Sequence, residues 1–179
     1  MQDLYTWSLG AIRSDSSMSW IEDKKEDWTP LLASRMKLLL DGYTFLVFCD
    51  DERSWLEDYI IKSINRPSSQ RPLLPFFSLK SIYPWLDSIN TNIGMELLND
   101  MLHLAFPNGF VYFYVGRGNY ALSQIAKNKD DSYMWLIGEN APNSFALDAK
   151  DESLDAKLLS LFALFDKSIS AILFDEVVV

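Results

Sequence analysis

Three consecutive carboxylates, Asp50, Asp51 and Glu52, are the side chains of this sequence best placed to do chemistry. They directly follow an apolar run at residues 44–49, which is typical of a buried strand. Clustered carboxylates can ligate a divalent cation or act as a general acid and base. They can also cap the helix that follows and complement its dipole. Capping needs no ligand, and it is the interpretation that we favour.

The same turn is a poor place for a phosphate. In an open α/β protein, the turn after the first strand usually binds phosphate through glycines and free backbone N–H groups. A phosphate about 5 Å from each carboxylate would be repelled by about 3 kcal/mol per charge pair at an effective dielectric constant of about 20. The helix dipole would return only about 0.3–1 kcal/mol. Nucleotides and sugar phosphates are therefore disfavoured as ligands.

The other reactive side chains are isolated. Cys49 is the only cysteine and ends an apolar run, so it is predicted to be a small buried side chain without a disulfide. His103 is the only histidine, which excludes a two-histidine metal site and favours a structural place on or near a helix surface. Segment 115–119 is predicted to be a tight turn, because it has two glycines but lacks the third of a dinucleotide-binding loop. We predict no catalytic, cofactor-binding or metal-binding residue.

The elements that hold these residues alternate between strands and helices. Pro75 cannot donate to a strand ladder, so the second strand is expected at an edge or a bulge. This alternation predicts a three-layer α/β sandwich, with a mainly parallel sheet of about five strands flanked by helices. Expected strands are 44–49, 73–77, 110–115, 133–137 and 144–147; expected helices are one through Leu4–Ile12, 27–41, 51–65, 92–106, 119–127 and 153–174; 80–90 shows little periodicity.

The 179 residues fit a single domain, residues 1–179, with an N-terminal helix and arm at 1–26. The net charge of −9 disfavours direct binding to nucleic acid, whose affinity depends on basic residues. The N-terminal residues lack the pattern of a signal peptide, and no apolar run is long enough to span a membrane. We therefore expect a cytoplasmic protein.

The last helix, within residues 153–175, is apolar on all sides, whereas one stripe would suffice to pack on a sheet. Two explanations stay open: a subunit or partner interface, which we favour, and a helix enclosed within the core of the monomer. Our candidate contact residues on this helix are Phe162, Phe165, Ile169 and Leu173. Trp20 and Ile21 in the arm are weaker candidates.

Several short segments share an order and spacing that is informative along nearly the whole chain. They are Asp41-Gly42, Ser54-Trp55 with Tyr59-Ile60, Arg71-Pro72-Leu73-Leu74, Tyr83-Pro84, and Leu154 with Lys157-Leu158-Leu159, Leu161-Phe162 and Leu164-Phe165. In this order and spacing the chain resembles the HobA-type DnaA-interacting proteins, which regulate the initiation of bacterial replication. Relatives of that family are the DiaA-like proteins. The resemblance implies the sugar-isomerase (SIS) fold, a SIS-like or flavodoxin-like arrangement in which a five-stranded parallel sheet lies between helices.

The resemblance implies a non-enzymatic adaptor. It implies a homotetramer, a dimer of dimers, that binds the N-terminal region of several DnaA molecules and promotes their ordered assembly at the chromosomal origin. The acidic turn stands where sugar-phosphate-binding members have a Gly/Ser-rich loop, so isomerase activity is not implied. In the DiaA-like branch the C-terminal helix contributes to DnaA binding, and the positions closest to that contact here are Ile169 and Ser170.

The alternative is an enzyme or sensor of the same fold that binds a phosphosugar or a nucleotide at the strand ends. Its candidate ligand residues are Arg53, Ser54, Arg117 and Asn119, which follow the predicted first and third strands.

Overall fold

The computed structural model describes residues 2–179 and divides the chain into two compact units. One unit is Leu38–Ala149, and the other joins the N-terminal segment up to Lys37 with Lys150–Val179. Within the described residues, no helix is long and apolar enough to cross a membrane.

The unit Leu38–Ala149 is built on a five-stranded sheet in which every neighbouring pair of strands is parallel. The order is β3-β2-β4-β5-β6. This confirms the predicted fold class. The strands are β2 (Thr44–Cys49), β3 (Phe76–Ser78), β4 (Phe110–Arg117), β5 (Tyr133–Ile137) and β6 (Ser144–Leu147).

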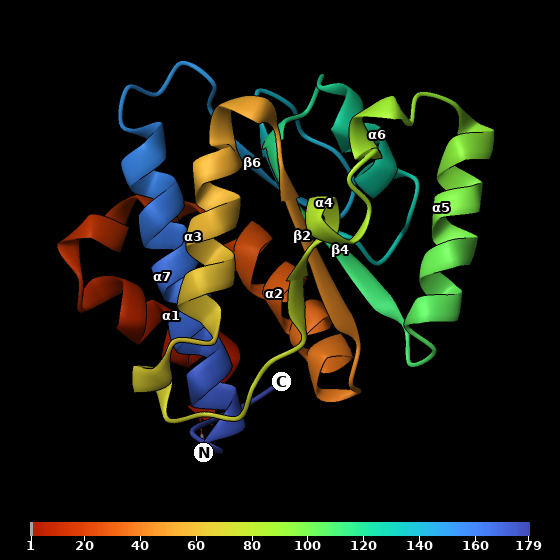
Figure 1. The fold of residues 1–179 in the computed structure, drawn as a ribbon. Coiled ribbons are helices and arrows are strands. Elements are labelled where there is room, and N and C mark those ends of the chain that lie inside the picture. Colours follow the sequence, from red (N-terminus) through yellow and green to blue (C-terminus); the bar gives the residue numbers. More distant parts are fainter. Residues whose placement is uncertain (1) are drawn as a thin grey trace. The chain divides into compact units, whose positions relative to one another are not determined.

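Helices lie on both faces of this sheet (Figure 1). In the sheet, β3 lies on one side of β2, and β4 lies on the other side. Right-handed crossovers therefore place the helix after β2 on the opposite face of the sheet from the later helices. In Figure 1, α3 lies on one side of the strands and α5 with α6 on the other. The helices are α3 (Ser54–Ile64), α4 (Leu79–Ile82), α5 (Asn92–Ala105) and α6 (Ala121–Lys127), with 3-10 turns η2 (Asp51–Arg53), η3 (Pro67–Ser69) and η4 (Leu86–Ser88).

The core of this unit forms because alternate residues of the strands face α5 and α6. Leu46, Phe48, Tyr112 and Tyr114 from β2 and β4 are fully buried in it. The opposite face of the sheet is also buried and aromatic: the ring of Phe113 lies against Tyr133 and Trp135, at 4.9 and 5.0 Å between centroids. Because both faces of the sheet are buried, these strands are continuous apolar runs in the sequence. The α5 and α6 side chains in the core are Met95, Leu98, Leu102, Leu122, Ile125 and Ala126.

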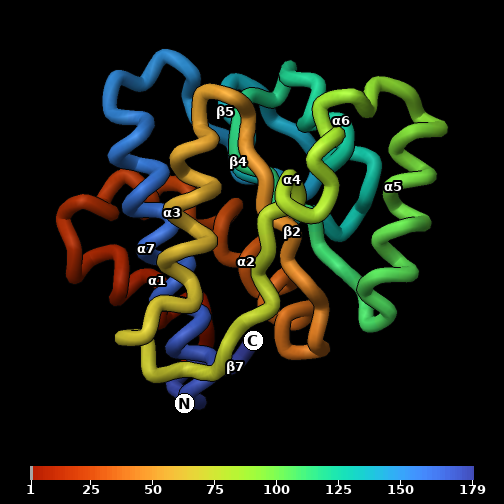
Figure 2. The backbone as a smooth tube through the Cα atoms, in the orientation of Figure 1, coloured from red at the N-terminus to blue at the C-terminus, as the bar shows by residue number. Residues whose placement is uncertain are grey.

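The other unit contains α1 (Leu4–Arg13), η1 (Ser16–Lys24), α2 (Lys25–Leu40) up to Lys37, and α7 (Leu154–Leu173). Two short strands, β1 (Gln2–Asp3) and β7 (Val177–Val178), pair in parallel and bring the two ends of the chain together, as Figure 2 shows. The sequence pattern did not predict this pairing, because two-residue strands carry no periodicity.

Three other segments differ from expectation. The edge strand starts at Phe76 rather than at residue 73, because Pro75 has no N–H for the ladder. Residues 80–90, expected to be irregular, form most of α4 and all of η4. The arm is mostly 3-10 helix η1, in which Met18 and Ile21 are buried. The remaining predicted elements match within about three residues at each end.

Candidate functional site

The acidic turn lies at the topological switch point of the sheet. From β2 the chain continues to β3 on one side of the sheet, whereas from β4 it continues to β5 on the other side. Open α/β proteins bind ligands at the carboxyl ends of two such neighbouring strands. The register pairs Cys49 with Val115, so the residue after β2, Asp50, lies beside the end of β4 at Arg117. Residues 67 positions apart in sequence are thereby brought into contact.

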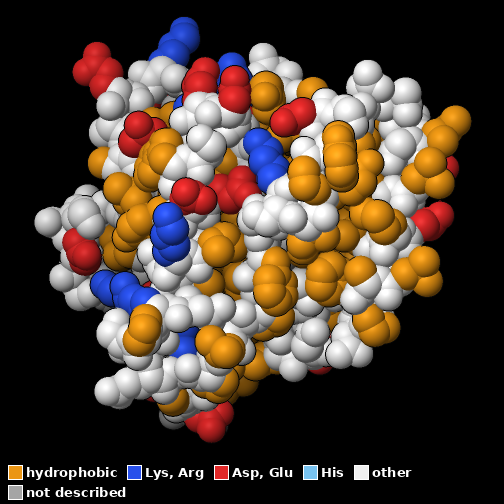
Figure 3. Space-filling model, in the orientation of Figure 1, with side chains coloured by type: hydrophobic (Ala, Val, Ile, Leu, Met, Phe, Trp, Pro, Cys, Tyr) orange, Lys and Arg blue, Asp and Glu red, His pale blue; other side chains and the backbone are white. Residues whose placement is uncertain are grey.

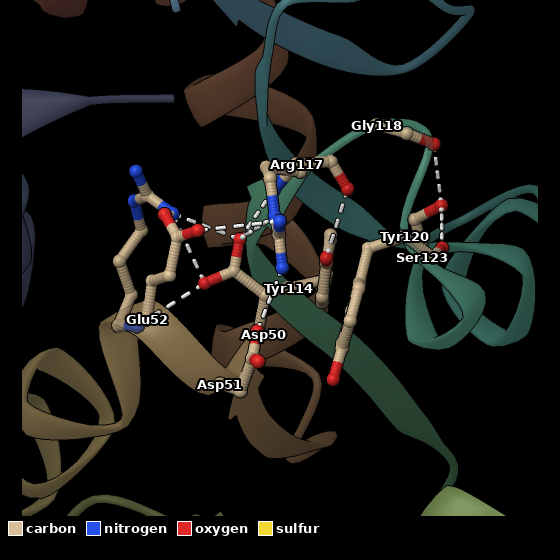
Figure 4. Close-up of polar contacts among 9 residues, drawn as sticks. Asp50, Asp51, Glu52, Tyr114, Arg117, Gly118, Tyr120 and Ser123 are labelled. Carbon is tan, nitrogen blue, oxygen red and sulfur yellow. Dashed lines mark hydrogen bonds and ion pairs between the residues drawn. The ribbon is translucent and has the colours of Figure 1, made fainter.

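The carboxylate of Asp50 is fully buried and is enclosed by donors (Figure 4). Its Oδ1 accepts from the backbone N–H of Arg53 at 3.1 Å, and its Oδ2 accepts from the backbone N–H of Arg117 at 2.7 Å. The Arg53 guanidinium adds Nη1 contacts of 3.1 Å to Oδ1 and 2.9 Å to Oδ2. Asp50 therefore caps η2, as predicted, and also ties the end of β2 to the end of β4.

Arg117 neutralises the outer part of the turn. Its Nη2 donates to Asp51 at 2.7 Å, and its Nη1 lies 3.2 Å from a Glu52 oxygen. Its guanidinium also lies 4.8 Å from the ring centroid of Tyr120. Desolvation opposes the charged form, but Glu52, Asp50 and Asp51 together raise the pKa of Arg117 above its ordinary value.

Two residues of β4 support this arrangement. Burial raises the pKa of Tyr114, so its phenol stays protonated and donates to the carbonyl of Arg117 at 3.0 Å. Gly116 lets Asp50 approach closely, because a Cβ there would lie 2.6 Å from the Tyr114 hydroxyl and 2.9 Å from Asp50 Oδ2. The glycine is therefore explained by packing against the internal carboxylate.

Side chains of α6 hold the turn after β4. Ser123 Oγ and Lys127 Nζ donate to the carbonyl of Gly118 at 2.6 and 2.7 Å. Lys127 also pairs with Glu139 at 2.6 Å. The predicted tight turn is confirmed by the bond from the Tyr120 N–H to the Arg117 carbonyl.

The acidic turn carries less net charge than its three carboxylates alone, because the two arginines offset two of the three charges. Asp50 also occupies two backbone N–H donors of the kind that bind a phosphate in related folds. Among residues 2–179, no group of three or more His, Cys, Asp or Glu side chains is arranged to hold a metal ion.

The alternative ligand residues are only partly brought together. The Arg53 and Arg117 side chains both lie against Asp50, whereas Asn119 is exposed. Ser54 borders a separate cavity of about 420 Å³ that is lined also by Trp55, Glu57, Asp58, Ser78, Lys80 and Ser81.

Cys49 and His103 lie where the sequence predicted. Cys49 is buried, and burial raises the pKa of its thiol well above the ordinary value, with smaller contributions from Glu57 and Asp50. A protonated buried thiol is a poor nucleophile. His103 is exposed on α5, and its ring lies 4.9 Å from that of Phe110.

The candidate contact residues on α7 lie at different depths. Phe162, Phe165 and Ile169 are buried within this chain, whereas Ser170 and Leu173 are half-buried. Burial within the chain thus accounts for much of the apolar surface of the helix. Leu159 on the helix and Phe174 directly after it are large apolar side chains on the surface.

The arm packs on the same helix. Trp20 is half-buried, its Nε1 donates to Ser160 Oγ at 3.0 Å, and Lys157 Nζ lies 5.3 Å from the Trp20 ring centroid. Ile21 is fully buried.

The sequence pattern did not reveal a second apolar surface, which lies on α5. Ile93, Leu97, Met101 and Leu104 recur every three or four residues and form an exposed stripe, with Leu97 63% and Leu104 87% accessible. The signal was present, because these positions face away from the core positions Met95, Leu98 and Leu102 on a helical projection. Figure 3 shows hydrophobic side chains gathered over this part of the molecule.

A cavity of about 280 Å³ adjoins the α5 stripe. Leu97 and Met101 of the stripe belong to its lining, together with residues of the segment before α5. Exposed apolar patches of this kind mark interaction surfaces. The other lining residues are Tyr83, Ser88, Ile89, Asn90, Thr91, Gly94 and Leu98.

The sheet order and the helices on both faces define a SIS-like α/β domain, and the buried carboxylate of Asp50 lies at its switch point. A phosphoheptose isomerase from Francisella tularensis has a similar fold, with a TM-score of 0.53, 15% identity, and coverage of 93% of this chain and 98% of that one. At that identity the likeness concerns the fold alone.

The family follows from comparisons over the full length. The family model described as "HobA: DNA replication regulator" matches residues 1–179, so the chain belongs to the HobA family. The DNA replication regulator protein HobA of Helicobacter pylori (strain ATCC 700392 / 26695) is 28% identical over 186 residues, covering 99% of each chain. The resemblance inferred from the sequence is confirmed.

Two solved structures of that relative are similar to this chain. The crystal structure of a HobA-DnaA (domain I-II) complex from Helicobacter pylori matches with a TM-score of 0.79 and 26% identity, over 100% of both chains. The structure of HobA from the same organism matches with a TM-score of 0.78 and 25% identity, over 100% of this chain and 99% of that one.

Proposed function

We propose that this protein is a non-enzymatic adaptor that binds the N-terminal region of the replication initiator DnaA and promotes its ordered oligomerisation at the chromosomal origin. The observation that carries the proposal is the similarity over the whole chain to a HobA that was crystallised with DnaA domains I-II. Membership of a family of DNA replication regulators supports the same role.

The site supports an adaptor rather than an enzyme. At the switch point, where a SIS-like enzyme would need an open ligand position, the buried carboxylate of Asp50 takes up the backbone N–H groups of Arg53 and Arg117. The alternative phosphosugar or nucleotide function would need those donors for its ligand. The filled position therefore argues against it.

The mechanism that we propose is multivalency in a homotetramer, arranged as a dimer of dimers. Several DnaA sites on one rigid body raise the local concentration of DnaA by orders of magnitude without a contact to DNA. The net charge of −9 supports an adaptor that does not itself compete for the origin. In this proposal the protein acts in the cytoplasm and needs neither a membrane nor a cofactor.

Titration calorimetry with DnaA domains I-II from the same organism tests the proposal, and light scattering gives the subunit count. We expect saturable binding to a tetramer. Absence of binding by the folded protein would refute the adaptor function. A monomer that binds DnaA would refute the multivalent mechanism alone.

A further inference from the structure

The carboxylate of Asp50 is held as a bound anion is held. It receives two backbone N–H groups, from Arg53 at 3.1 Å and from Arg117 at 2.7 Å, which come from the ends of different strands. Guanidinium groups approach it as well, with Arg53 Nη1 at 2.9 Å and Arg117 Nε at 3.4 Å. Charged donors of this kind form the strongest hydrogen bonds to an oxyanion.

Contacts that do not involve Asp50 also hold Arg117. Tyr114 donates to the carbonyl of Arg117 at 3.0 Å, and Arg117 is also held by Asp51 at 2.7 Å. Gly116 provides space, because a Cβ there would come within 2.9 Å of the Asp50 carboxylate. Arg53 is only 8% accessible, and within residues 2–179 its Nε is buried with no hydrogen-bond partner.

We propose that the switch point is an oxyanion-binding site that Asp50 fills from within the chain, and that a small carboxylate anion binds there once the Asp50 side chain is removed. The two backbone N–H groups and the two guanidiniums are the ligands of this site. In the native chain the tethered carboxylate has a high local concentration and keeps free anions out. The proposal concerns the switch point and does not depend on DnaA binding.

The test is chemical rescue of two variants with probes matched in size. Asp50→Ala removes the carboxylate, and formate replaces those atoms. Asp50→Gly removes the whole side chain, and acetate replaces it. The thermal midpoint of each variant is measured against the concentration of its anion, with sodium chloride of equal ionic strength as the reference. We expect the midpoint to rise with the logarithm of the anion concentration, by about 5–10 °C at 100 times the dissociation constant.

Two controls isolate the site. Asp58→Ala removes a carboxylate of α3 that is 76% accessible, and leaves Asp50 and the residues around it in place. That variant and the native protein should respond to formate, acetate and phosphate no more than to chloride. A midpoint of the native protein that rises more in these anions than in chloride would overturn the proposal, because the site would then be open.

The variants are informative even if they are unfolded in chloride. In that case refolding from urea in formate or acetate should recover the native circular dichroism spectrum. Variants that respond equally to chloride, or that stay unfolded in their matched anion, would overturn the proposal.

Discussion

The backbone N–H of Arg117, at the end of β4, donates to the carboxylate of Asp50, directly after β2, at 2.7 Å. This bond closes the carboxyl-terminal edge of the sheet at the switch point. The position at which a parallel α/β sheet ordinarily receives a ligand is thus part of the folded chain itself. A protein in which a side chain of the chain itself occupies this position can keep the fold and use other surfaces for its function.

Replacing Asp50 by Ala in chloride buffer should lower the free energy of unfolding by about 3–5 kcal/mol, because two buried guanidinium contacts and two backbone N–H groups lose their partner. The matched variant Asp51→Ala removes an exposed partner of Arg117 and should cost less than about 1 kcal/mol. Urea unfolding followed by circular dichroism measures both. Equal losses for the two variants would contradict the central role of Asp50.

Much of this fold could be predicted from the sequence. The strands β2 and β5 have the expected bounds, because runs such as 44–49 are apolar without interruption. The position that Pro75 predicts for the second strand, at an edge of the sheet, is confirmed by β3. The short helices at 79–88 were not predicted, since one turn of helix carries no periodicity and its stability comes from tertiary packing.

The site could be predicted only in part. Capping by Asp50 follows from local sequence, but its pairing with Arg117 depends on the strand register, which no local pattern specifies. From the sequence, Arg117 is a candidate ligand residue, and nothing in the local pattern indicates that it pairs with Asp51 and Glu52. The first and third predicted strands are parallel neighbours in the structure, and this arrangement places their ends together.

Gly116→Ala should destabilise the protein by about 1–3 kcal/mol, because the new methyl group would overlap the Tyr114 hydroxyl and the Asp50 carboxylate. Gly10→Ala is the matched control, since no atom lies within 4 Å of the added Cβ and the residue is inside helix α1. That change should stabilise by about 0.5–1 kcal/mol. Thermal and urea unfolding of the pair give the sign of each effect, and a Gly116→Ala variant as stable as the native protein would contradict the packing argument.

Acid should weaken the start of α7. Hydrogen bonds from Lys157 and Ser153 lower the pKa of Asp151 from 3.8 to about 2. Between pH 3.8 and about 2 the unfolded chain takes up the proton before the folded chain does, so this contribution to stability is lost as the pH falls through that window. Asp151→Asn should have a shallower acid dependence of the unfolding midpoint than the native protein. Lys157→Met, which removes the first partner, should flatten the same window, and an unchanged slope in both variants would contradict the pairing.

A charge at the half-buried end of α7 should weaken the proposed contact with DnaA. Ser170→Glu is expected to reduce the affinity for DnaA domains I-II at least about tenfold, since a carboxylate would be desolvated in the complex. Ala156→Glu places the same side chain at an exposed position near the other end of the helix and should bind normally. Phe162, Phe165 and Ile169 are unsuitable for this test, because their burial means that substitutions there would first disturb folding. Calorimetry of both variants decides, and equal affinities would remove this end of α7 from the interface.

The exposed stripe on α5 should be covered in the proposed homotetramer. Leu97 is 63% accessible in the single chain and belongs to a row of apolar side chains, so Leu97→Lys should reduce the subunit count in light scattering while the circular dichroism spectrum stays that of the native fold. Glu96→Lys introduces the same side chain at the adjacent exposed position, about 100° around the helix from Leu97, and should assemble as the native protein does. If Leu97→Lys keeps the native mass but loses affinity for DnaA, the stripe belongs to the partner surface instead. A variant with native mass and native affinity would show that the stripe serves neither contact.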